Sequence, residues 1–419
     1  MDTQKLDQTY IANTYARFPV TIVKGKGSLV WDDTGKEYID LSTGIAVDIF
    51  GVADEEWMAA VTKQLGTLQH ISNLYYTEPC VKLAQMLCEK TGMKKVFFGN
   101  SGAEANECAI KAARKWSEEK NGKDYSTIIT LKNSFHGRTI TTLAATGQDV
   151  FHHDFTPLTE GFVYAEPNDL ADLEQLIKAN KCAAVMMEVV QGEGGVMPLD
   201  EAYVKGAAKL CEQYDLLLIC DEVQVGNGRS GKLYGYMHYG VQPDIVSTAK
   251  GLAGGLPLGA TLLGEKVQDV LSAGTHGSTF GGNPVCCAGA INVLSRLDEK
   301  MLEGVEERSA YIKQELAGAK GVLVVSGLGL MLGIQTEKNA SDIIAACREK
   351  GVLVIKAKDK LRLLPALNIP MEQLQKDIDF LTVFTGRFAN AAVCPVAREI
   401  PETIRKQLDE YLFRKRKEA

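Results

Sequence analysis

The stretch LLLICDEVQVGNGRSG, residues 216–231, is an apolar run that leads directly into two acidic residues and then into glycines. A wholly apolar run is typical of a strand buried on both faces of a parallel sheet. Helical stretches alternate with similar short runs between about residues 80 and 300, at 95–98, 127–131, 183–190, 245–247 and 260–263. This alternation predicts an α/β fold, whose large domain has a mainly parallel sheet covered by helices on both faces. Ligands of such sheets bind beyond the carboxyl ends of the strands, so the polar residues that follow these runs are candidate site residues.

The segments on either side of this sheet predict smaller units. The sequence GSLVWDDTGKEYIDL has the turn signal DDTG between two alternating runs and predicts a hairpin near the N-terminus. Residues 291–317 predict one long amphipathic helix, and the apolar runs within 321–336 and 351–367 predict strands of a smaller α+β domain. Residues 398–419 predict a tail helix. We therefore expect four parts: an N-terminal segment that joins the small domain (1–55), the large domain (56–305), the small domain (306–390) and the tail (391–419).

The composition excludes several classes of protein. The chain has 419 residues, of which 45% are hydrophobic and 24% charged, and its net charge of −7 argues against a nucleic-acid binder with a basic surface. The first residues contain no apolar core of a signal peptide, and no apolar run approaches the roughly 18 residues of a membrane span. The ten cysteines lack the spacing of metal ligands or of a disulfide framework. We expect a cytoplasmic protein with no metal site, no membrane contact and no nucleic-acid partner.

Residues 97–116, FFGNSGAEANECAIKAARKW, place small residues where a predicted strand turns into a predicted helix. Ser101, Gly102 and Ala103 offer a hydroxyl and free backbone N–H groups at the start of that helix. Such a turn suits a phosphate, because the N–H groups point outward and the helix dipole favours an anion. A helix that is only capped has the same pattern, so this segment alone leaves both interpretations open.

Two further residues stand at predicted strand ends. Asp221 follows the run at 216–220, where a carboxylate can serve a bound ligand or can be a helix cap or part of an ion pair. Lys250 stands between the run at 245–247 and the glycine-rich sequence GLAGG. Burial would lower the pKa of this lysine and free its amine to attack a carbonyl, whereas the alternative is an exposed lysine in a turn.

Two nucleotide motifs also overlap the opening stretch. Gly226, Gly228 and Gly231 match G-x-G-x-x-G, but a poor helix former, KLYGYMHYG, follows them. The same residues nearly match a P-loop, but Leu233 occupies the position where a magnesium-binding hydroxyl is needed. Both nucleotide interpretations are therefore weak.

Taken together, the three segments supply what pyridoxal phosphate needs. Its phosphate needs N–H donors, its aldehyde needs an amine, and its ring nitrogen needs an acid that keeps it protonated. The sequence NSFHGRT, residues 133–139, adds Phe135, which can stack on a ring, and Arg138, which can bind a carboxylate. The sequence EVVQGEGGV, residues 188–196, adds Glu188 and Glu193 after another predicted strand.

These motifs resemble the class III pyridoxal-phosphate aminotransferases, a family of fold type I. The resemblance runs from about residue 14 to residue 370, and its most specific parts are DEVQ, the Lys250-Gly251 pair and HGSTFGGNP (276–284). The segments most similar to the acetylornithine branch of the family are STGIAV (42–47), SNLYYTEP (72–79), NSGAEANE (100–107) and SFHGRT (134–139). The resemblance implies transfer of the ω-amine of N²-acetyl-L-ornithine to 2-oxoglutarate, a step of arginine biosynthesis. Open alternatives are another ω-amino donor (4-aminobutyrate, succinylornithine, succinyl-diaminopimelate, lysine or a polyamine) and a nucleotide-binding or scaffold protein that keeps the fold without catalysis.

The resemblance also implies a role for individual residues. The implied catalytic residues are Lys250, which would bond the cofactor and move the proton, Asp221, which would pair with the ring nitrogen, and Glu193. The residues implied to hold the cofactor are Ser101, Gly102, Ala103, Phe135, Glu188, Asp221, Gln224, Lys250 and Thr279. The residues implied to bind substrate are Arg138, Arg362 and Ser278. Thr279 would reach the cofactor of the neighbouring subunit, so a homodimer is expected.

The resemblance further implies that Glu193 pairs with Arg362 and covers it while an ω-amino substrate is bound. That exchange would let one site accept two substrates of different charge. The chain departs from the family pattern in residues 50–55, FGVADE, which lack the usual His and Pro near the substrate entrance. It also continues past the usual end from about residue 391.

Overall fold

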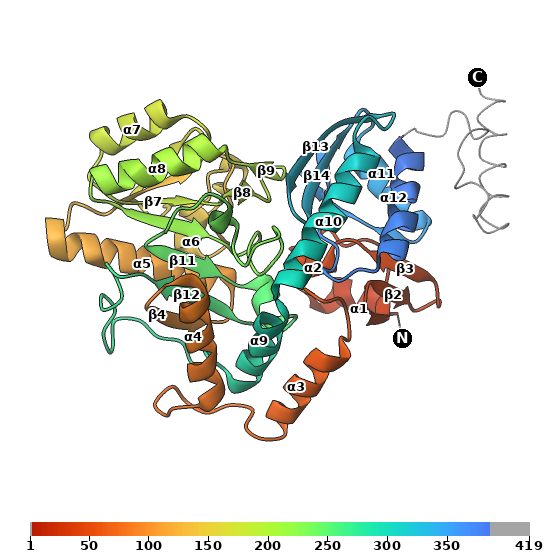
Figure 1. Ribbon diagram of the computed structural model, residues 1–419, viewed down its shortest axis with the longest axis horizontal. Helices are drawn as coiled ribbons and strands as arrows, with labels where there is room; N and C mark the ends of the chain where they lie inside the picture. Colours follow the sequence, from red (N-terminus) through yellow and green to blue (C-terminus); the bar gives the residue numbers. More distant parts are fainter. Residues whose placement is uncertain (1, 386–419) are drawn as a thin grey trace.

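The computed structural model describes residues 2–385, and its largest element is a seven-stranded sheet (Figure 1). In spatial order the strands are β4 (Lys95–Gly99), β12 (Gly259–Leu263), β11 (Ile245–Thr248), β10 (Leu217–Asp221), β7 (Cys182–Met187), β5 (Thr127–Leu131) and β6 (Phe162–Ala165). Strand β12 is antiparallel to both of its neighbours, and the other pairings are parallel. The predicted α/β fold with a mainly parallel sheet is confirmed.

Both faces of this sheet are buried beneath helices. The helices of this part are α4 (Glu78–Thr91), α5 (Gly102–Asn121), α6 (Ile140–Ala145), α7 (Leu170–Ala179) and α8 (Glu201–Gln213). Ile128 of β5 packs in one core cluster with Ala109 of α5, whereas Ile129 packs in the other cluster with Leu173 of α7 and Val204 of α8. Successive side chains of a strand point to opposite faces, so burial of both faces explains why these strands read as continuous apolar runs.

Two parts of this sheet differ from the sequence prediction. Strand β6, at the edge, was not predicted, because its run FVYA is short and only half-buried. The run at 183–190 does not form one strand, since β7 ends at Met187 and β8 (Val190–Gln191) pairs with β9 (Met197–Pro198) as a separate two-stranded sheet. The chain therefore changes direction at the carboxyl edge of the large sheet.

The single helix expected over 291–317 is wrong. The chain forms two helices there, α9 (Pro284–Arg296) and α10 (Glu299–Leu316), which run between the two parts of the molecule in Figure 1. Asp298 separates them, because its side chain accepts the N–H of Met301 at 2.8 Å and caps the second helix.

The smaller part of the molecule contains two four-stranded sheets. One consists of β13 (Val322–Leu328), β14 (Met331–Thr336), β17 (Lys360–Leu363) and β16 (Ile355–Ala357), and the other of β1 (Ile22–Lys26), β2 (Leu29–Asp32), β3 (Glu37–Asp40) and β15 (Val352–Leu353). The predicted hairpin and small-domain strands are confirmed. Because β15 pairs with β3, the N-terminal strands lie against the C-terminal ones. The domain limits at 55, 305 and 390 stay a prediction, and the tail helix expected at 398–419 lies outside the described residues.

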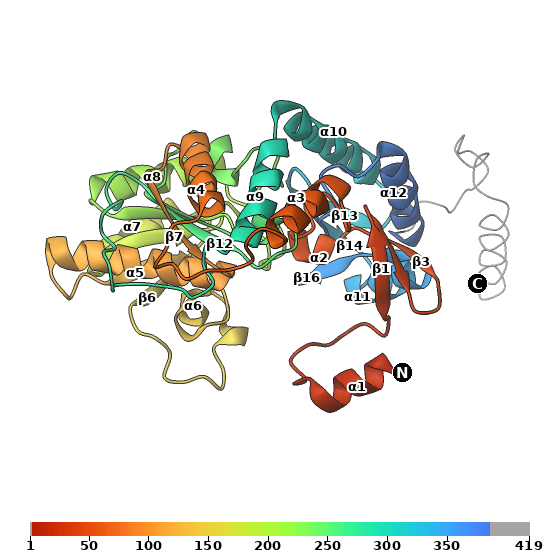
Figure 2. The same ribbon diagram turned by 90° about the horizontal axis from the view of Figure 1, so that it is seen from below.

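The remaining elements connect or flank these sheets. They are α1 (Thr3–Tyr10), α2 (Thr43–Ala46), α3 (Glu55–Leu65), α11 (Ala340–Glu349), α12 (Met371–Thr385) and the 3₁₀ helices η1 (Asp149–Phe151), η2 (Gly235–His238) and η3 (Lys250–Ala253). Figure 2 shows α1 standing away from the body of the molecule, beyond β1. None of the described helices is long and apolar enough to cross a membrane.

Residues 50–55, which depart from the family pattern, form a packed corner. The guanidinium of Arg296 lies 3.9 Å from the centre of the Phe50 ring and donates to both carboxylate oxygens of Asp54, at 2.5 and 3.0 Å. Asp54 also accepts the N–H of Trp57 and so caps α3. Burial alone would raise the pKa of Asp54, but the bonds from Arg296 and from the backbone outweigh it and lower this pKa.

We predict that Asp54→Asn lowers the free energy of unfolding by about 2 kcal/mol at pH 7, because a partly buried bidentate ion pair loses its charge while the cap oxygen remains. Since the folded-state pKa of Asp54 is below its ordinary value of 3.8, this contribution is complete above pH 3.8 and is lost as the pH falls through the folded-state pKa. Urea unfolding at several pH values measures it.

The matched control is Glu55→Gln, since Glu55 pairs with Lys26 where both side chains are exposed, at 81% and 74%. This control is expected to change stability by less than about 0.5 kcal/mol. Equal effects of the two substitutions would contradict the role given to Asp54.

Candidate active site

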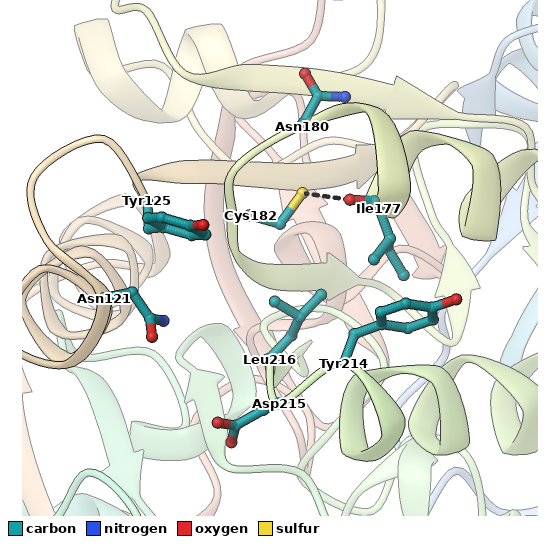
Figure 3. Close-up of a pocket in the computed structure, with 8 residues that line it drawn as sticks. All are labelled: Asn121, Tyr125, Ile177, Asn180, Cys182, Tyr214, Asp215 and Leu216. Atoms are coloured by element: carbon teal, nitrogen blue, oxygen red, sulfur yellow. Dashed lines mark hydrogen bonds between the residues drawn. The ribbon is translucent and has the colours of Figure 1, made fainter.

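The two ends of the large sheet differ in chemistry. A shallow pocket at the amino ends of β5, β7 and β10 is lined by Tyr125, Cys182 and Tyr214 among others, and it contains none of the predicted site residues (Figure 3). Asp221 ends β10 at the opposite edge, and Lys250 follows β11 there. The candidate site therefore lies at the carboxyl edge of the sheet, where parallel α/β sheets bind ligands.

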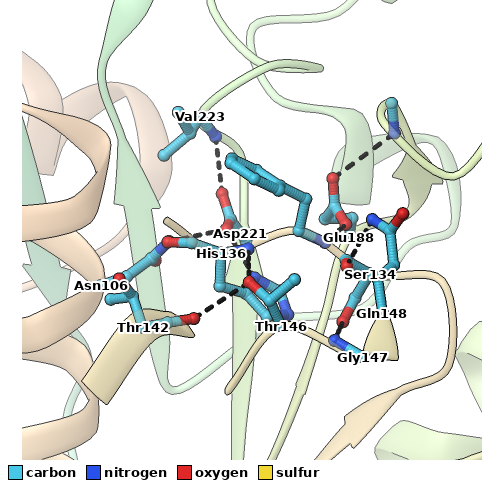
Figure 4. A network of polar contacts seen from close by, with 12 residues as sticks. Asn106, Ser134, His136, Thr142, Thr146, Gly147, Gln148, Glu188, Asp221 and Val223 are labelled. Atoms are coloured by element: carbon cyan, nitrogen blue, oxygen red, sulfur yellow. Dashed lines mark hydrogen bonds and ion pairs between the residues drawn. The ribbon is translucent and has the colours of Figure 1, made fainter. Parts of the chain in front are cut away.

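Asp221 is the most densely bonded side chain of the site (Figure 4). Its carboxylate is 3% exposed and accepts three hydrogen bonds, from Asn106 Nδ2 at 2.7 Å, from His136 Nδ1 at 2.8 Å and from the N–H of Val223 at 3.0 Å. A carboxylate has about four lone-pair sites, so Asp221 retains room for one more donor. The bond and charge of Asp221 outweigh the burial of His136 and raise the pKa of that imidazole.

Lys250 begins η3 with a backbone φ of 47°, in the left-handed region that a residue with a side chain rarely adopts. Burial lowers the pKa of its amine, and the charges of Glu193 and Asp221 oppose that shift only in part. The charges of Glu193 and Asp221 therefore act on an amine whose pKa lies below its usual range. Lys250 is only half-buried, but it is not the exposed turn lysine of the second interpretation.

The turn before α5 lies next to the Asp221 loop. Ser101 caps the helix, since its Oγ accepts the N–H of Glu104 at 3.2 Å, and the following N–H groups have no partner within the helix. A Cβ on Gly102 would lie 2.6 Å from Val223 Cγ1, so only glycine permits this approach. The anion-binding turn and the carboxylate are thus held side by side.

Arg362 of β17 reaches the site from the small part of the molecule. It is 3% exposed and donates to Glu193, with Nη1 to Oε1 at 2.5 Å, and to Gln224 Oε1 at 3.1 Å. Gln224 in turn donates to Glu193 at 3.4 Å. Burial alone would raise the pKa of Glu193, but Arg362 and the charge of Lys250 outweigh it and lower this pKa. The predicted pairing of Glu193 with Arg362 is present in the structure.

Phe135, Arg138 and Glu188 come from the segments that directly follow β5 and β7. The guanidinium of Arg138 is 4.4 Å from the ring centre of Phe151 and 5.7 Å from that of Phe135, and Arg138 is exposed. The Phe135 N–H donates to Glu188 Oε2 at 2.9 Å. Burial, together with the charge of Asp221, raises the pKa of Glu188 to about 7, against the opposing effect of His136.

Ser278 and Thr279 lie in a loop beside the turn at 100–103. Ser278 Oγ accepts Asn100 Nδ2 at 3.1 Å and the N–H of Gly281 at 2.9 Å, which places it next to the anion-binding turn. Thr279 is exposed on the surface. The structure therefore places Ser278 near the site of its own chain and leaves Thr279 accessible to a neighbour.

Two residues of the site were missed or undervalued in the sequence analysis. Asn106 donates to Asp221 and also to the carbonyl of His136, at 2.8 Å, and so joins two segments. Its signal was a polar residue on the apolar face of α5, between Ala105 and Cys108. Phe151 gave no signal, because η1 is a short turn with no pattern.

The arrangement fits the pyridoxal phosphate implied by the sequence. The helix N-terminus offers N–H groups to a phosphate, the amine of Lys250, whose pKa is lowered by burial, can bond an aldehyde, and Asp221 has a free acceptor site for a ring N–H. Among the described residues no cluster of His, Cys, Asp and Glu is arranged to hold a metal ion. The glycines at 226–231 are followed by η2 and by no α-helix before β11, so the structure does not support a nucleotide loop.

Comparison with known proteins identifies the relatives of the chain. The family model of aminotransferase class-III matches residues 10–383. An acetylornithine aminotransferase of Haemophilus ducreyi is 50% identical over 90% of this chain and 97% of its own, and a succinylornithine transaminase of Salmonella typhimurium is 43% identical over 92% and 96%. The solved ornithine aminotransferase from Toxoplasma gondii ME49 has a TM-score of 0.88 at 32% identity and covers 91% of this chain and 94% of its own. The solved N-acetylornithine aminotransferase from Stenotrophomonas maltophilia has a TM-score of 0.79 at 36% identity and covers 91% and 97%.

We predict that Asp221→Asn lowers the pKa of His136, because the charge that opposes burial is removed and only the burial effect remains. Nitrogen NMR of histidine-labelled protein across the pH range measures this shift, with His136→Gln used for assignment. His238 is the control, since it contacts Ser230 and burial lowers its pKa, so its titration should not change. An unchanged titration of His136 would refute the assigned coupling.

Proposed function

The chain belongs to the class-III aminotransferases, which act with pyridoxal phosphate, and we propose that it transfers the ω-amine of N²-acetyl-L-ornithine to 2-oxoglutarate. The products are N-acetyl-L-glutamate 5-semialdehyde and L-glutamate, so the reaction is a step of arginine biosynthesis. The observation that carries the proposal is the ion pair between Glu193 and Arg362, whose charges act on the amine of Lys250. The relatives that act on acetylornithine support the choice of donor.

The cofactor supplies an aldehyde that takes up the amine and a ring that stabilises the negative charge left when the reacting carbon loses its proton. In our proposal Lys250 moves that proton. Burial lowers the pKa of its amine, which makes the neutral form that takes the proton more accessible, and the nearby charges of Glu193 and Asp221 would stabilise the protonated amine.

Asp221 would accept a hydrogen bond from the ring nitrogen and keep a proton on that atom. Asn106, His136 and the N–H of Val223 hold its carboxylate in place, so its remaining acceptor site points in one direction. Ser101, Gly102 and Ala103 would bind the phosphate, Gln224 would contact the ring hydroxyl, Phe135 would stack on the ring, and Glu188 would help to hold the cofactor.

Arg362 and Glu193 explain how one site takes two different substrates. Glutamate carries a carboxylate on its reacting carbon, and this carboxylate would bind Arg362 after Glu193 moves aside. The reacting carbon of acetylornithine carries no carboxylate, so Arg362 needs the negative charge of Glu193 to stay paired while buried. Arg138 would bind the carboxylate at the other end of either substrate, and Ser278 lies near that end.

A donor with a different acyl group is the second candidate. The similarity to succinylornithine transaminases favours succinylornithine among the alternatives. Both donors have the same ω-amine and α-carboxylate, so the contacts of Lys250 and Arg138 would serve either one. The distinction therefore depends on the acyl group and needs a direct measurement.

We also propose that the active unit is a homodimer. Four large apolar residues lie exposed near Thr279, namely Leu74 (86%), Tyr75 (64%), Tyr76 (100%) and Phe280 (59%). Asn73 joins their two loops by donating to the carbonyls of Ser278 and Gly281, both at 2.9 Å. A contiguous exposed apolar patch favours a protein interface, and Thr279 would cross it to the partner's phosphate.

We propose a cytoplasmic location because the cysteines form no disulfides among the described residues. The nine cysteines of the described residues are all free, and most are buried. Free thiols in this number are typical of a reducing compartment.

The first test is an absorption titration of the cofactor-loaded protein with single amino donors and no oxo acid. We expect the visible band of the cofactor to bleach with N²-acetylornithine at concentrations where 4-aminobutyrate and free ornithine have little effect. If succinylornithine bleaches the band at lower concentrations than N²-acetylornithine does, succinylornithine is the amino donor instead. A protein that takes up no pyridoxal phosphate would overturn the proposal.

The second test separates the two half-reactions. Arg362→Ala is expected to slow the glutamate half-reaction by roughly a hundredfold, since a lost buried carboxylate contact costs on the order of 3 kcal/mol, and to spare the acetylornithine half-reaction. Stopped-flow absorption with each amino donor measures both rates.

Glu193→Gln is the reciprocal variant. It leaves the charge of Arg362 unpaired, so the acetylornithine half-reaction should slow more than the glutamate half-reaction. Equal losses in both half-reactions for both variants would contradict the exchange between Glu193 and Arg362.

A further inference from the structure

Arg229 is a fully buried arginine that none of the roles above includes. It lies in the loop 226–231 that follows β10 and Gln224, and its side chain is 0% exposed. Burial lowers the pKa of its guanidinium to about 9. Among the described residues its Nε and Nη2 atoms have no hydrogen-bond partner, so this charge is buried without a carboxylate. Burying a charge without a carboxylate partner lowers the stability of the folded protein, so we look for a role of Arg229 other than stability.

The contacts of Arg229 cross from the large part of the molecule to the small one. Nη1 donates to the carbonyl of Leu330 at 3.3 Å and to the carbonyl of Pro365, and the carbonyl of Arg229 accepts the N–H of Leu330 at 2.9 Å. A Cβ on Gly329 would lie 2.4 Å from the Arg229 carbonyl oxygen. The β13–β14 turn is therefore pressed directly against this loop.

The two acceptors flank the strand pair that carries Arg362. Leu330 directly precedes β14 and Pro365 follows β17, and within this pair Gly333 stands opposite Arg362. A Cβ on Gly333 would lie 2.8 Å from Val196 Cβ, in the loop that also contains Glu193. A shift of this strand pair would therefore move the guanidinium of Arg362 relative to Glu193 and Gln224.

We propose that Arg229 is a positioning residue for recognition of the substrate α-carboxylate. It fixes the β14–β17 pair to the loop after Gln224, and so holds Arg362 where it can bond either Glu193 or the carboxylate of glutamate and 2-oxoglutarate. The inference rests on the proposed function. If the inference is right, substitution of Arg229 should impair the glutamate half-reaction, which uses Arg362, more than the acetylornithine half-reaction.

The test compares Arg229→Lys and Arg229→Met in the cofactor-loaded enzyme. For Arg229→Met we expect the half-saturating concentration of glutamate to rise by tenfold or more, because small misplacements of a binding group have effects of this size. The half-saturating concentration of acetylornithine should change by less than about threefold. Arg229→Lys keeps the positive charge and N–H donors but lacks the planar guanidinium, and should give an intermediate value. Calorimetric binding of glutarate, an unreactive dicarboxylate, should weaken in parallel.

Arg308→Met is the matched control. Arg308 is a half-buried arginine that, like Arg229, donates to backbone carbonyls, in its case those of Ile369 and Gly304, both at 2.7 Å. It is expected to lower thermal stability without changing the ratio of the two half-reactions. If Arg229→Met does not fold, the lysine variant alone carries the comparison.

A second comparison uses the Arg362→Ala background. If Arg229 acts through Arg362, Arg229→Lys should have little further effect on glutamate there. Equal losses for glutamate and acetylornithine, or full additivity with Arg362→Ala, would show a merely structural role and overturn the inference. A wild-type enzyme that fails to react with acetylornithine would instead refute the proposed function, and glutamate binding would still report on Arg229.

Discussion

The buried carboxylate of Asp221 is the constraint on which the rest of the site depends. A carboxylate that is 3% exposed is costly unless its oxygens are bonded. Its donors come from three segments, namely Asn106 of α5, His136 of the loop after β5 and the N–H of Val223 in its own turn. Satisfying one charge therefore fixes three segments at one edge of the sheet, and the turn before α5, which is proposed to bind the phosphate, is fixed with them.

The loop 226–231 extends this constraint to the other half of the site. Asn227 donates to Thr248 Oγ1 and to the carbonyl of Ala249, both at 3.0 Å, directly before Lys250. Arg229, two residues later, holds the strands that carry Arg362. One short loop thus contacts both the segment that leads into Lys250 and the strands that carry Arg362. The glycines of this loop let its backbone lie close to other segments, since a Cβ on Gly228 would lie 2.8 Å from the side chain of Leu297.

The sequence was sufficient to predict those features that lie within one continuous segment. Six of the seven strands of the large sheet followed from apolar runs, and Asp221 and Lys250 followed from their place after such runs. The break before Asp298 had a local signal, an N-cap residue, that the longer apolar pattern obscured. The roles of Asn106 and Arg229 could not be predicted, because each depends on a partner far away in the sequence. Asp221 is 115 positions from Asn106, and Leu330 is 101 positions from Arg229. Spacing along the chain carries no information on contacts of this kind.

The charges of the site explain why its two halves belong to different parts of the molecule. Glu193 and Lys250 stand on the large part, whereas Arg362 comes from the small one. A fixed buried pair of Glu193 and Arg362 would hold one charge state, and a site with Arg362 alone would carry an uncompensated charge whenever acetylornithine is bound. A carboxylate on a glycine-flanked loop, Gly192-Glu193-Gly194, can approach and leave a cation whose own position does not change. In the proposed exchange Arg362 keeps its position while Glu193 moves, and the contacts of Arg229 with Leu330 and Pro365 would hold Arg362 in place.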